Sequence, residues 1–449
     1  MKIGIMHFRV GETDGVSLEI EKQIQALTQR GFSVIRISGE TKDVESSVLD
    51  GIAMNDPENL DIFHASFADL GTLSPDDLER KILKKAKSIQ KKLTTLIQRE
   101  QLGGLIVHNI WALGWNLPAA IGVTESIKET GIRGIGHNHD FYWERSQYDQ
   151  PTTPFIQKIM EQYLPPSGPG FFHFVINQIA QNQLKRRKAI PSVVLPNVMD
   201  FQAPMWKRDG FSETIRPKLG IAPHDLVFLQ ATRILPRKGI EMAFDFIEAF
   251  QEAFASLDRS SRQPIFTGGP ILQKDSQIHF VLCGYAEQQD QDYLALLHQK
   301  ALKHSYSTHF CGDLVGQTRS ENPVRFSLWD MYTMADIITY PSIQEGWGNQ
   351  LLEAIFAKKL ILGYEYPVFQ TDIGPKGIRI ISLGSSAQTI QNNLRVVPKP
   401  DMDRAIQMLA DLLRDPAAVQ DWVSSNFSIG KDCFSLSVLG DALEKAFFQ

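Results

Sequence analysis

The chain has 449 residues, of which 43% are hydrophobic and 22% charged, and its net charge is −5. This length exceeds what one compact core usually supports, so two domains are expected, and the composition is that of an ordinary globular protein. The slightly negative net charge excludes a dedicated nucleic-acid-binding protein, which would have an excess of basic residues.

The first half of the chain alternates strand and helix patterns. Compact apolar runs predict strands at 2–8, 33–37, 104–109 and 132–137. Helical periodicity is found from Val16 to Leu27, over 118–129 and around 174–188, where it leads into the apolar stretch 192–197. Such a succession is typical of a mostly parallel sheet with helices on both faces. We therefore expect a first α/β domain over residues 1–200.

The same pattern restarts after the proline-rich connector 196–204. Strands are predicted at 226–231, 279–283, 336–341 and 359–363, and helices at 239–256, from about Asn349, over 401–424 and from about Leu436 to the end. The insert 257–277 is expected to be a surface loop. We assign a second doubly wound domain to 201–425 and a C-terminal helical segment to 426–449; whether this segment returns to the first domain is left open.

The segment 340–354 is predicted to form a strand end, a loop and a helix start. Gly346 and Gly348 let the backbone approach a ligand closely, and the N–H groups of a helix start favour an anion such as phosphate. Glu345 and Glu353 are carboxylates that can accept hydrogen bonds from the neighbouring hydroxyls of a sugar. The alternative, an ordinary helix with an acidic start, leaves the loop glutamate and the glycines unexplained.

Two cations stand in another loop that follows a predicted strand. Arg233 and Lys238 lie in 232-TRILPRKGIE-241, before a helix. Two permanent cations directed at one cleft suit a diphosphate, since arginine binds it through two N–H groups and lysine as a point charge. The alternative is a pair of solvated surface residues.

Together these stretches resemble the retaining GT-B glycosyltransferases of family GT4, known as glycosyl transferases group 1. The resemblance is carried by Arg-x4-Lys-Gly at 233–239 and by 332-YTMADIITYPSIQEGWGNQLLEA-354, with further likeness at 13–17, 282–287 and 310–314. It implies two Rossmann-like, doubly wound parallel-sheet domains facing an interdomain cleft. The first would hold the acceptor, and the second the nucleotide-sugar donor.

The resemblance also implies residue roles. Arg233 and Lys238 would bind the donor diphosphate, Glu345 the transferred sugar and Glu353 the ribose. The other implied substrate contacts are Gly15, Gly284, Gly346, Trp347, Gly348, Asn349 and Gln350. His139 would face the anomeric carbon, oriented by Asp140; His137 is the rival for that place.

The expected chemistry needs no metal and no cofactor besides the nucleotide sugar. Charge that develops on the departing diphosphate would be stabilised by fixed cations and helix N–H groups. The Asp-x-Asp triplets at 290–292 and 401–403 lie in or next to polar helical segments, and no His/Cys cluster has zinc spacing. The resemblance further implies retention of the anomeric configuration.

The acceptor and the surface are less defined. Arg9, Arg133, Arg145 and Lys128 would suit a small anionic acceptor, such as a sugar phosphate or a glucosylglycerate-like compound, and solvated surface is the alternative. The basic helix 80–100 is a core-packed helix or, alternatively, a membrane-docking one. The segment 363–377 departs from the family pattern beside the donor site, so it bears on donor choice.

We therefore predict a retaining hexosyltransferase that uses GDP-mannose or a UDP- or ADP-glucose type of donor. A sugar-nucleotide epimerase of the same fold, and a transferase acting on a lipid or polysaccharide at the membrane, remain alternatives. The three cysteines, without a Cys-x-x-Cys pair, and the lack of a long apolar run predict a cytoplasmic protein. A homodimer is left open.

Overall fold

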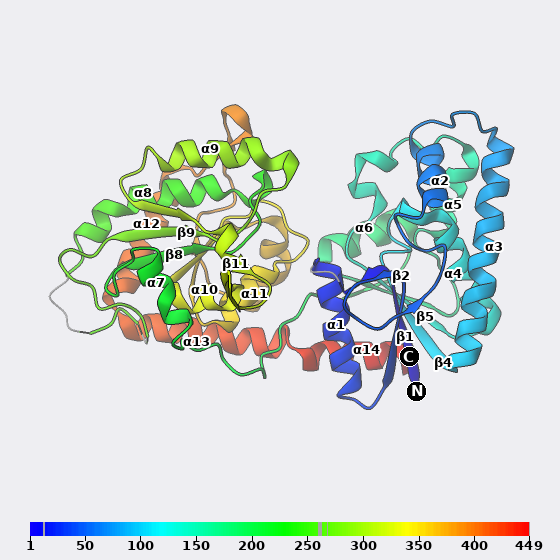
Figure 1. The fold of residues 1–449 in the computed structure, drawn as a ribbon, viewed down its shortest axis with the longest axis horizontal. Coiled ribbons are helices and arrows are strands. Elements are labelled where there is room, and N and C mark those ends of the chain that lie inside the picture. Colours follow the sequence, from blue (N-terminus) through cyan, green and yellow to red (C-terminus); the bar gives the residue numbers. More distant parts are fainter. Residues whose placement is uncertain (12–13, 259–262, 267, 449) are drawn as a thin grey trace. The chain divides into compact units, whose positions relative to one another are not determined.

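The computed structural model describes residues 1–11, 14–258, 263–266 and 268–448. They form two compact units, one comprising Met1–Asp200 and Phe434–Gln449, the other Phe201–Cys433 (Figure 1). Thr13 of the loop 13–17, and residues 259–262 and 267 of the insert 257–277, lie outside the described residues. No helix within the described ranges is both long and apolar enough to cross a membrane.

The first unit is built on a seven-stranded parallel sheet. Its strands are β1 (Lys2–Val10), β2 (Ser33–Thr41), β3 (Ser47–Val48), β4 (Leu102–His108), β5 (Arg133–Asn138), β6 (Phe171–Val175) and β7 (Val193–Val194). They follow the order β3-β2-β1-β4-β5-β6-β7, and every pairing is parallel. β1 is buried along most of its length, as its continuous apolar run predicts for a strand covered on both faces.

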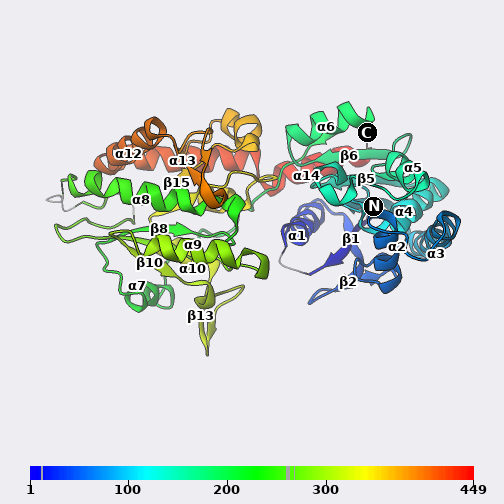
Figure 2. The same cartoon turned by 90° about the horizontal axis from the view of Figure 1, so that it is seen from above.

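Helices cover both faces of this sheet. They are α1 (Gly15–Thr28), α2 (Pro57–Phe67), α3 (Pro75–Glu100), α4 (Leu117–Thr130), α5 (Pro154–Tyr163), α6 (Gln178–Lys188) and α14 (Leu436–Phe448). One core cluster combines residues of α2 to α6, and the other combines α1 with α14. α14 lies beside α1 in both views (Figures 1 and 2). The apolar face of α3 is buried in the first of these clusters, so the basic face of that helix is the solvated one.

One prediction in this unit is wrong. The helix expected around 174–188 starts only at Gln178, and Phe171–Val175 is the strand β6. The side chain of Asn177 accepts a hydrogen bond from the backbone N–H of Ala180 at 2.7 Å and caps α6. The aromatic run of β6 merges with the helical periodicity in the sequence, whereas this cap separates the two elements.

The second unit repeats the α/β pattern on a six-stranded parallel sheet. Its strands are β8 (Leu226–Gln230), β9 (Ile278–Leu282), β10 (Ser307–Phe310), β14 (Ile337–Tyr340), β15 (Leu360–Gly363) and β16 (Ile381–Ser382). Their order is β10-β9-β8-β14-β15-β16. Two small sheets join β11 (Val315–Gly316), β13 (Val324–Ser327) and β12 (Ser320–Glu321), and β17 (Gln388–Thr389) with β18 (Arg395–Val396). The expected α/β class is confirmed for both units.

The helices of this unit are α7 (Ile215–Lys218), α8 (Ile240–Ala255), α9 (Gln291–Ala301), α10 (Leu328–Met334), α11 (Asn349–Phe356), α12 (Lys399–Arg414) and α13 (Pro416–Cys433). The helix predicted over 401–424 is thus two helices. The break falls at Asp415, because Pro416 lacks the N–H that would continue α12.

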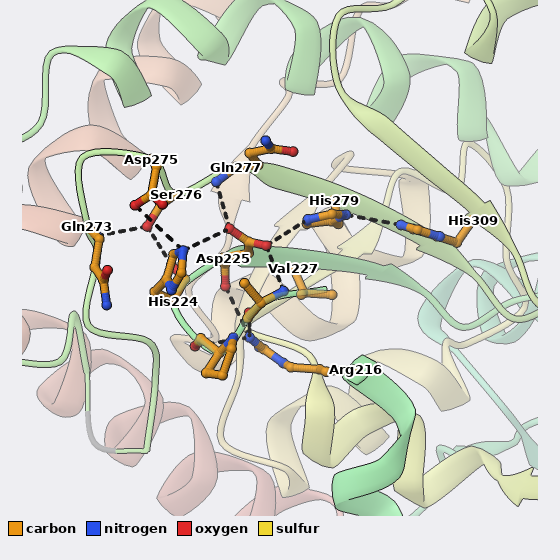
Figure 3. Close-up of polar contacts among 12 residues, drawn as sticks. Arg216, His224, Asp225, Val227, Gln273, Asp275, Ser276, Gln277, His279 and His309 are labelled. Carbon is orange, nitrogen blue, oxygen red and sulfur yellow. Dashed lines mark hydrogen bonds and ion pairs between the residues drawn. The ribbon is translucent and has the colours of Figure 1, made fainter. Parts of the chain in front are cut away.

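A buried polar network closes the amino-terminal edge of the second sheet (Figure 3). Asp225 directly precedes β8, and its carboxylate accepts the backbone N–H groups of Ala222 and Gln277, each at 2.8 Å. Nε2 of His279 lies 3.0 Å from the same carboxylate, and Nδ1 of His279 lies 3.0 Å from Nε2 of His309. This network stabilises the edge opposite to the loops discussed next.

Candidate active site

The loop between β14 and α11 forms the centre of the candidate site. β14 ends at Tyr340 and α11 begins at Asn349, so 341–348 follow the carboxyl end of the strand. Gly348, the N-cap, has a φ of 140°, and a Cβ at this residue would lie 2.6 Å from Oη of Tyr366. Glycine suits both the backbone conformation and the space. The chain therefore enters α11 without an N-cap side chain in front of its first N–H groups.

Trp347 is held in place by the segment that departs from the family pattern. Tyr366, within 363–377, donates its hydroxyl hydrogen to the carbonyl of Trp347 at 2.5 Å, and both side chains are buried. The ring of Tyr366 also packs edge-on against Tyr340, with 6.0 Å between the ring centroids. The segment 363–377 thus supports the candidate loop directly.

Glu345 lies between two cations. Nζ of Lys238 is 2.5 Å from Oε1 of Glu345, and a guanidinium nitrogen of Arg237 is 2.7 Å from Oε2. Only 10% of the Glu345 side chain and 6% of the Lys238 side chain are exposed. Burial opposes ionisation of Glu345, yet the charges of Lys238 and Arg237 outweigh it and lower the pKa of the carboxyl. Burial also lowers the pKa of Lys238, although Glu345 opposes that shift.

The two cations that the sequence groups together, Arg233 and Lys238, have different carboxylate partners in the structure. Arg233 is about half exposed, and its guanidinium lies 2.5 Å from a carboxylate oxygen of Glu287. Lys238 instead shares Glu345 with Arg237, a residue that the sequence analysis did not select. Pro236–Lys238 form a 3₁₀ turn, which brings these two successive basic residues to one carboxylate. The Pro-Arg-Lys-Gly string is the signal that could have indicated this.

Gly284 joins two loops of the second unit. A Cβ at Gly284 would lie 1.8 Å from the carbonyl oxygen of Thr232, so a side chain does not fit there. The backbone N–H of Ile234 donates to the carbonyl of Tyr285 at 2.9 Å. The loops after β8 and β9 are therefore in contact, and the first of them carries the Arg237–Lys238 turn.

Glu353 lies within α11 and is partly buried. The buried hydroxyl of Tyr332 donates to its Oε2 at 2.9 Å, and the same hydroxyl is 3.4 Å from the carbonyl of Gln350. Burial raises the pKa of Tyr332, with a further contribution from Glu353. Tyr332 thus fixes one oxygen of Glu353. The tyrosine opens the family string quoted above, but its contact could not be read from the string.

In the first unit, His139 belongs to a cluster of three histidines. His108 ends β4, His137 lies opposite it on β5, and one ring nitrogen of each of the three lies within 4.8 Å of the other two. Nδ1 of His108 is 3.0 Å from Nε2 of His139. Burial lowers the pKa of all three, to about 4 for His137. His139 keeps partial exposure and His137 does not. We name His108, His137 and His139 the histidine cluster.

Asp140 and the ring of His139 have different partners in this structure, and the orienting role expected for Asp140 stays a prediction. Asp140 forms an ion pair with Arg145 and accepts a hydrogen bond from Asn109 at 3.2 Å. The ring of His139 contacts His108 instead, and its backbone N–H donates to Asn109 at 2.9 Å.

Gly15 is the first residue of α1 and is exposed. Beside it, the carboxylate of Asp14 accepts the backbone N–H groups of Val16 and Ser17 at 3.0 and 3.1 Å. Arg9, one of the cations considered for the acceptor, lies 3.5 Å from Asp14. Lys128 pairs with Glu125 at 2.9 Å. These cations therefore already have carboxylate partners within the first unit.

Three comparisons with known proteins bear on this site. The family model described as glycosyl transferases group 1 matches residues 211–425. A mannosylglucosylglycerate synthase of Petrotoga mobilis is 37% identical over 438 residues, which cover 98% of this chain and 99% of the relative. A mannosylglucosylglycerate synthase of Thermotoga maritima is 34% identical over 447 residues, which cover 99% of each chain.

Among solved structures, Anabaena Alr3699/HepE in complex with UDP and glucose superposes with a TM-score of 0.58 at 14% identity, covering 100% of this chain and 99% of that one. At this identity the likeness shows the fold alone, and that fold is GT-B. Sequence relatives and fold agree with the two parallel-sheet units described above. The chain belongs to the group 1 glycosyltransferases, and it is a homologue of mannosylglucosylglycerate synthases.

Proposed function

We propose that this enzyme transfers a mannosyl group from a nucleotide sugar to glucosylglycerate, with retention of the anomeric configuration and without a metal ion. The names of the two relatives support the sugar and the acceptor. The observation that carries the donor side is the buried contact of Glu345 with Lys238 and Arg237. It places a carboxylate and two cations in loops at the carboxyl edge of the sheet, where open α/β folds bind ligands.

In the proposed reaction, the bond between the anomeric carbon of the donor and the diphosphate oxygen breaks. The acceptor oxygen forms the new bond to that carbon on the same face, and the acceptor proton passes to the departing diphosphate. Lys238 and Arg237 stabilise the negative charge that develops there, with Arg233 as a third cation on the same loop. Until a donor is bound, Glu345 holds the Lys238 ammonium in position.

The remaining site residues bind and orient the substrates. Glu345 accepts hydrogen bonds from hydroxyls of the mannosyl group, and Glu353, fixed by Tyr332, accepts them from the ribose. The backbone from Gly346 to Asn349, with Trp347 and Gln350, surrounds the sugar and the phosphates. Gly284 lies towards the nucleotide base and Gly15 towards the phosphates. His139 faces the anomeric carbon, and Asp140 contributes to substrate binding through Arg145, with which it pairs.

The test is a set of reactions with glucosylglycerate and, separately, GDP-mannose, UDP-glucose and ADP-glucose. We expect release of a nucleoside diphosphate only when donor and acceptor are both present, with mannose as the transferred sugar. The one-bond coupling between the anomeric carbon and its hydrogen should show the same anomeric configuration in the product as in the donor, and EDTA should not lower the rate. Conversion of the donor to an isomeric nucleotide sugar without acceptor would point to the epimerase alternative and overturn the proposal.

A further inference from the structure

The histidine cluster has the composition of a site for a borderline divalent cation. His108 and His137 are opposite each other on neighbouring parallel strands, and His139 follows two residues after His137. His137 is a residue of β5, whereas His139 lies in the bend that follows this strand. The ring centroids of His137 and His139 are 4.4 Å apart, and those of His108 and His137 are 5.1 Å apart.

The distances are close to those of metal coordination. A tetrahedral ion with bonds of about 2.0–2.1 Å to nitrogen separates two ligand nitrogens by about 3.3 Å. Nδ1 of His108 and Nε2 of His139 are 3.0 Å apart. To bind an ion, these two nitrogens need to move apart by only a few tenths of an ångström, with a rotation of the rings. With His137 included, one ring nitrogen of each of the three histidines lies within 4.8 Å of the other two.

The groups around the three rings also suit a cation. The side-chain amide of Gln23 lies 3.1 Å from Nε2 of His108 and 2.6 Å from Nδ1 of His137. The backbone of Leu195 is a further polar neighbour of the His137 ring. The amide oxygen of Gln23 can accept the N–H of Nε2 of His108, which leaves the lone pair of that ring on Nδ1, the nitrogen that faces His139; this is the position of an outer group at a metal-binding histidine.

We propose that His108, His137 and His139 bind a divalent cation of the Zn²⁺, Co²⁺ or Ni²⁺ class, with Gln23 as the residue that positions the ring of His108. Imidazole ligands without a carboxylate favour these ions over Mg²⁺ and Ca²⁺. Asp140, the acidic residue next to His139, is engaged by Arg145 and stays outside the site. A bound cation occupies the lone pair of His139 and therefore inhibits transfer; this consequence rests on the role of His139 in the proposed function.

Binding can be measured without any reaction. Untagged full-length protein, stripped with EDTA and dialysed, is titrated with Co²⁺ while the visible spectrum is recorded. We expect the intense bands of tetrahedral cobalt with nitrogen ligands, at one ion per chain. His139→Gln, a change at the partly exposed member, should weaken binding at least tenfold. Gln23→Met, which leaves all three ligands in place, should weaken it by about tenfold.

The matched control is His64→Gln, because His64 is exposed on α2 in the same unit and should leave the titration unchanged. Circular dichroism of each variant checks that the chain is folded. Absence of the bands, or unchanged binding by the folded His139→Gln variant, would overturn the proposal. If Co²⁺ binds but transfer continues at full rate, the metal site stands and the role of His139 in transfer falls. Transfer without any cobalt binding overturns the metal-site proposal and leaves the proposed function standing.

Discussion

Lys238 and Glu345 form a buried ion pair across two loops of the second unit, with 2.5 Å between Nζ and Oε1. The two residues are 107 positions apart in the sequence. Arg237 adds a second cation to the same carboxylate. The free energy of such a pair depends on keeping both partners, because a buried charge without its partner is strongly destabilising.

Replacement of Lys238 tests the proposed stabilisation of the leaving group. For Lys238→Met we expect kcat/KM to fall by about 10²–10³, the usual effect of removing one group that stabilises developing charge. Arg237 still neutralises Glu345 in this variant, so the fold should persist. The measurement is initial rate of nucleoside diphosphate release. Lys303→Met, at an exposed position after α9, is the control and should keep the parent rate; equal rates for both variants would remove Lys238 from the mechanism.

Replacement of Glu345 tests the ion pair itself. Glu345→Gln keeps the shape but leaves the buried ammonium of Lys238 without its carboxylate, so we expect a loss of about 3 kcal/mol in the free energy of unfolding. Urea unfolding measures this loss. The control is Glu252→Gln, an exposed position on α8. A variant as stable as the parent chain would show that the pair contributes nothing to the native state.

Gly348 and Tyr366 should be energetically coupled. Gly348→Ala forces a side chain into a φ of 140° and places its Cβ 2.6 Å from Oη of Tyr366, so we expect a loss of about 1–3 kcal/mol. Tyr366→Phe removes the hydrogen bond to Trp347 and should cost about 1 kcal/mol. The double variant should lose at least about 0.5 kcal/mol less than the sum, because the steric contact is gone. Additive losses in urea unfolding would contradict the contact.

Tyr332 offers a test of the proposed contact between Glu353 and the ribose of the donor. Tyr332→Phe removes the hydroxyl that fixes Glu353, so we expect the donor KM to rise about tenfold while kcat changes little, as for lost uniform binding. Steady-state kinetics at several donor concentrations separate the two constants. Tyr163→Phe is the control, since Tyr163 also contacts a glutamate, at 3.4 Å, but in the first unit. A fall in kcat with an unchanged KM would place Glu353 away from the ground-state complex.

The network of Figure 3 predicts a pH dependence of stability. Burial lowers the pKa of His279, against the effect of Asp225, and burial and His279 together lower the pKa of His309. Their folded pKa values lie below the unfolded value of 6.5, so the stability they contribute is present above pH 6.5 and is lost as the pH falls through the folded values. The melting temperature should therefore fall between pH 6.5 and pH 5.

The variant His309→Gln should show a smaller fall, because one of the two titrating rings is absent. His64→Gln, exposed on α2, should follow the parent curve. The readout is the difference in melting temperature between variant and parent at each pH, which cancels the groups common to both. Parallel curves for His309→Gln and the parent chain would show that His309 titrates alike in the folded and unfolded states.

The fold was predictable where a periodic apolar pattern is long and bounded by turns. β1 and β8 are continuous apolar runs, and their positions follow from the sequence. β6 was missed because its aromatic residues continue into the pattern of α6, and β10 because Ser307–Phe310 is short and only half-buried. The type of an element can thus be predicted where burial dictates its composition. It cannot be predicted where a single cap or one strand pairing determines whether the segment is a helix or a strand.

The candidate site divides in the same way. The sequence from Tyr332 to Ala354 predicted the turn before α11. The turn needs a positive φ at residue 348, and a glycine at that position indicates this requirement by itself. The partners of Lys238 and His139 could not be predicted, since they depend on a 3₁₀ turn and on the neighbour of β5 in the sheet. The roles of these residues in transfer stay predictions until the variants are measured.

The placement of α14 has a consequence for synthesis of the chain. This helix completes a core cluster with Leu436, Leu439 and Leu443. Other members of the cluster, including Ile3 and Ile20, come from the part of the first unit that precedes residue 201. The first unit is therefore discontinuous in sequence. The whole second unit is translated before α14, the last helix of the first unit, emerges from the ribosome. Until then, one face of the sheet in the N-terminal part stays incompletely covered, while the second unit can already fold. A nascent chain that ends before Phe434 should expose this face to chaperones and proteases.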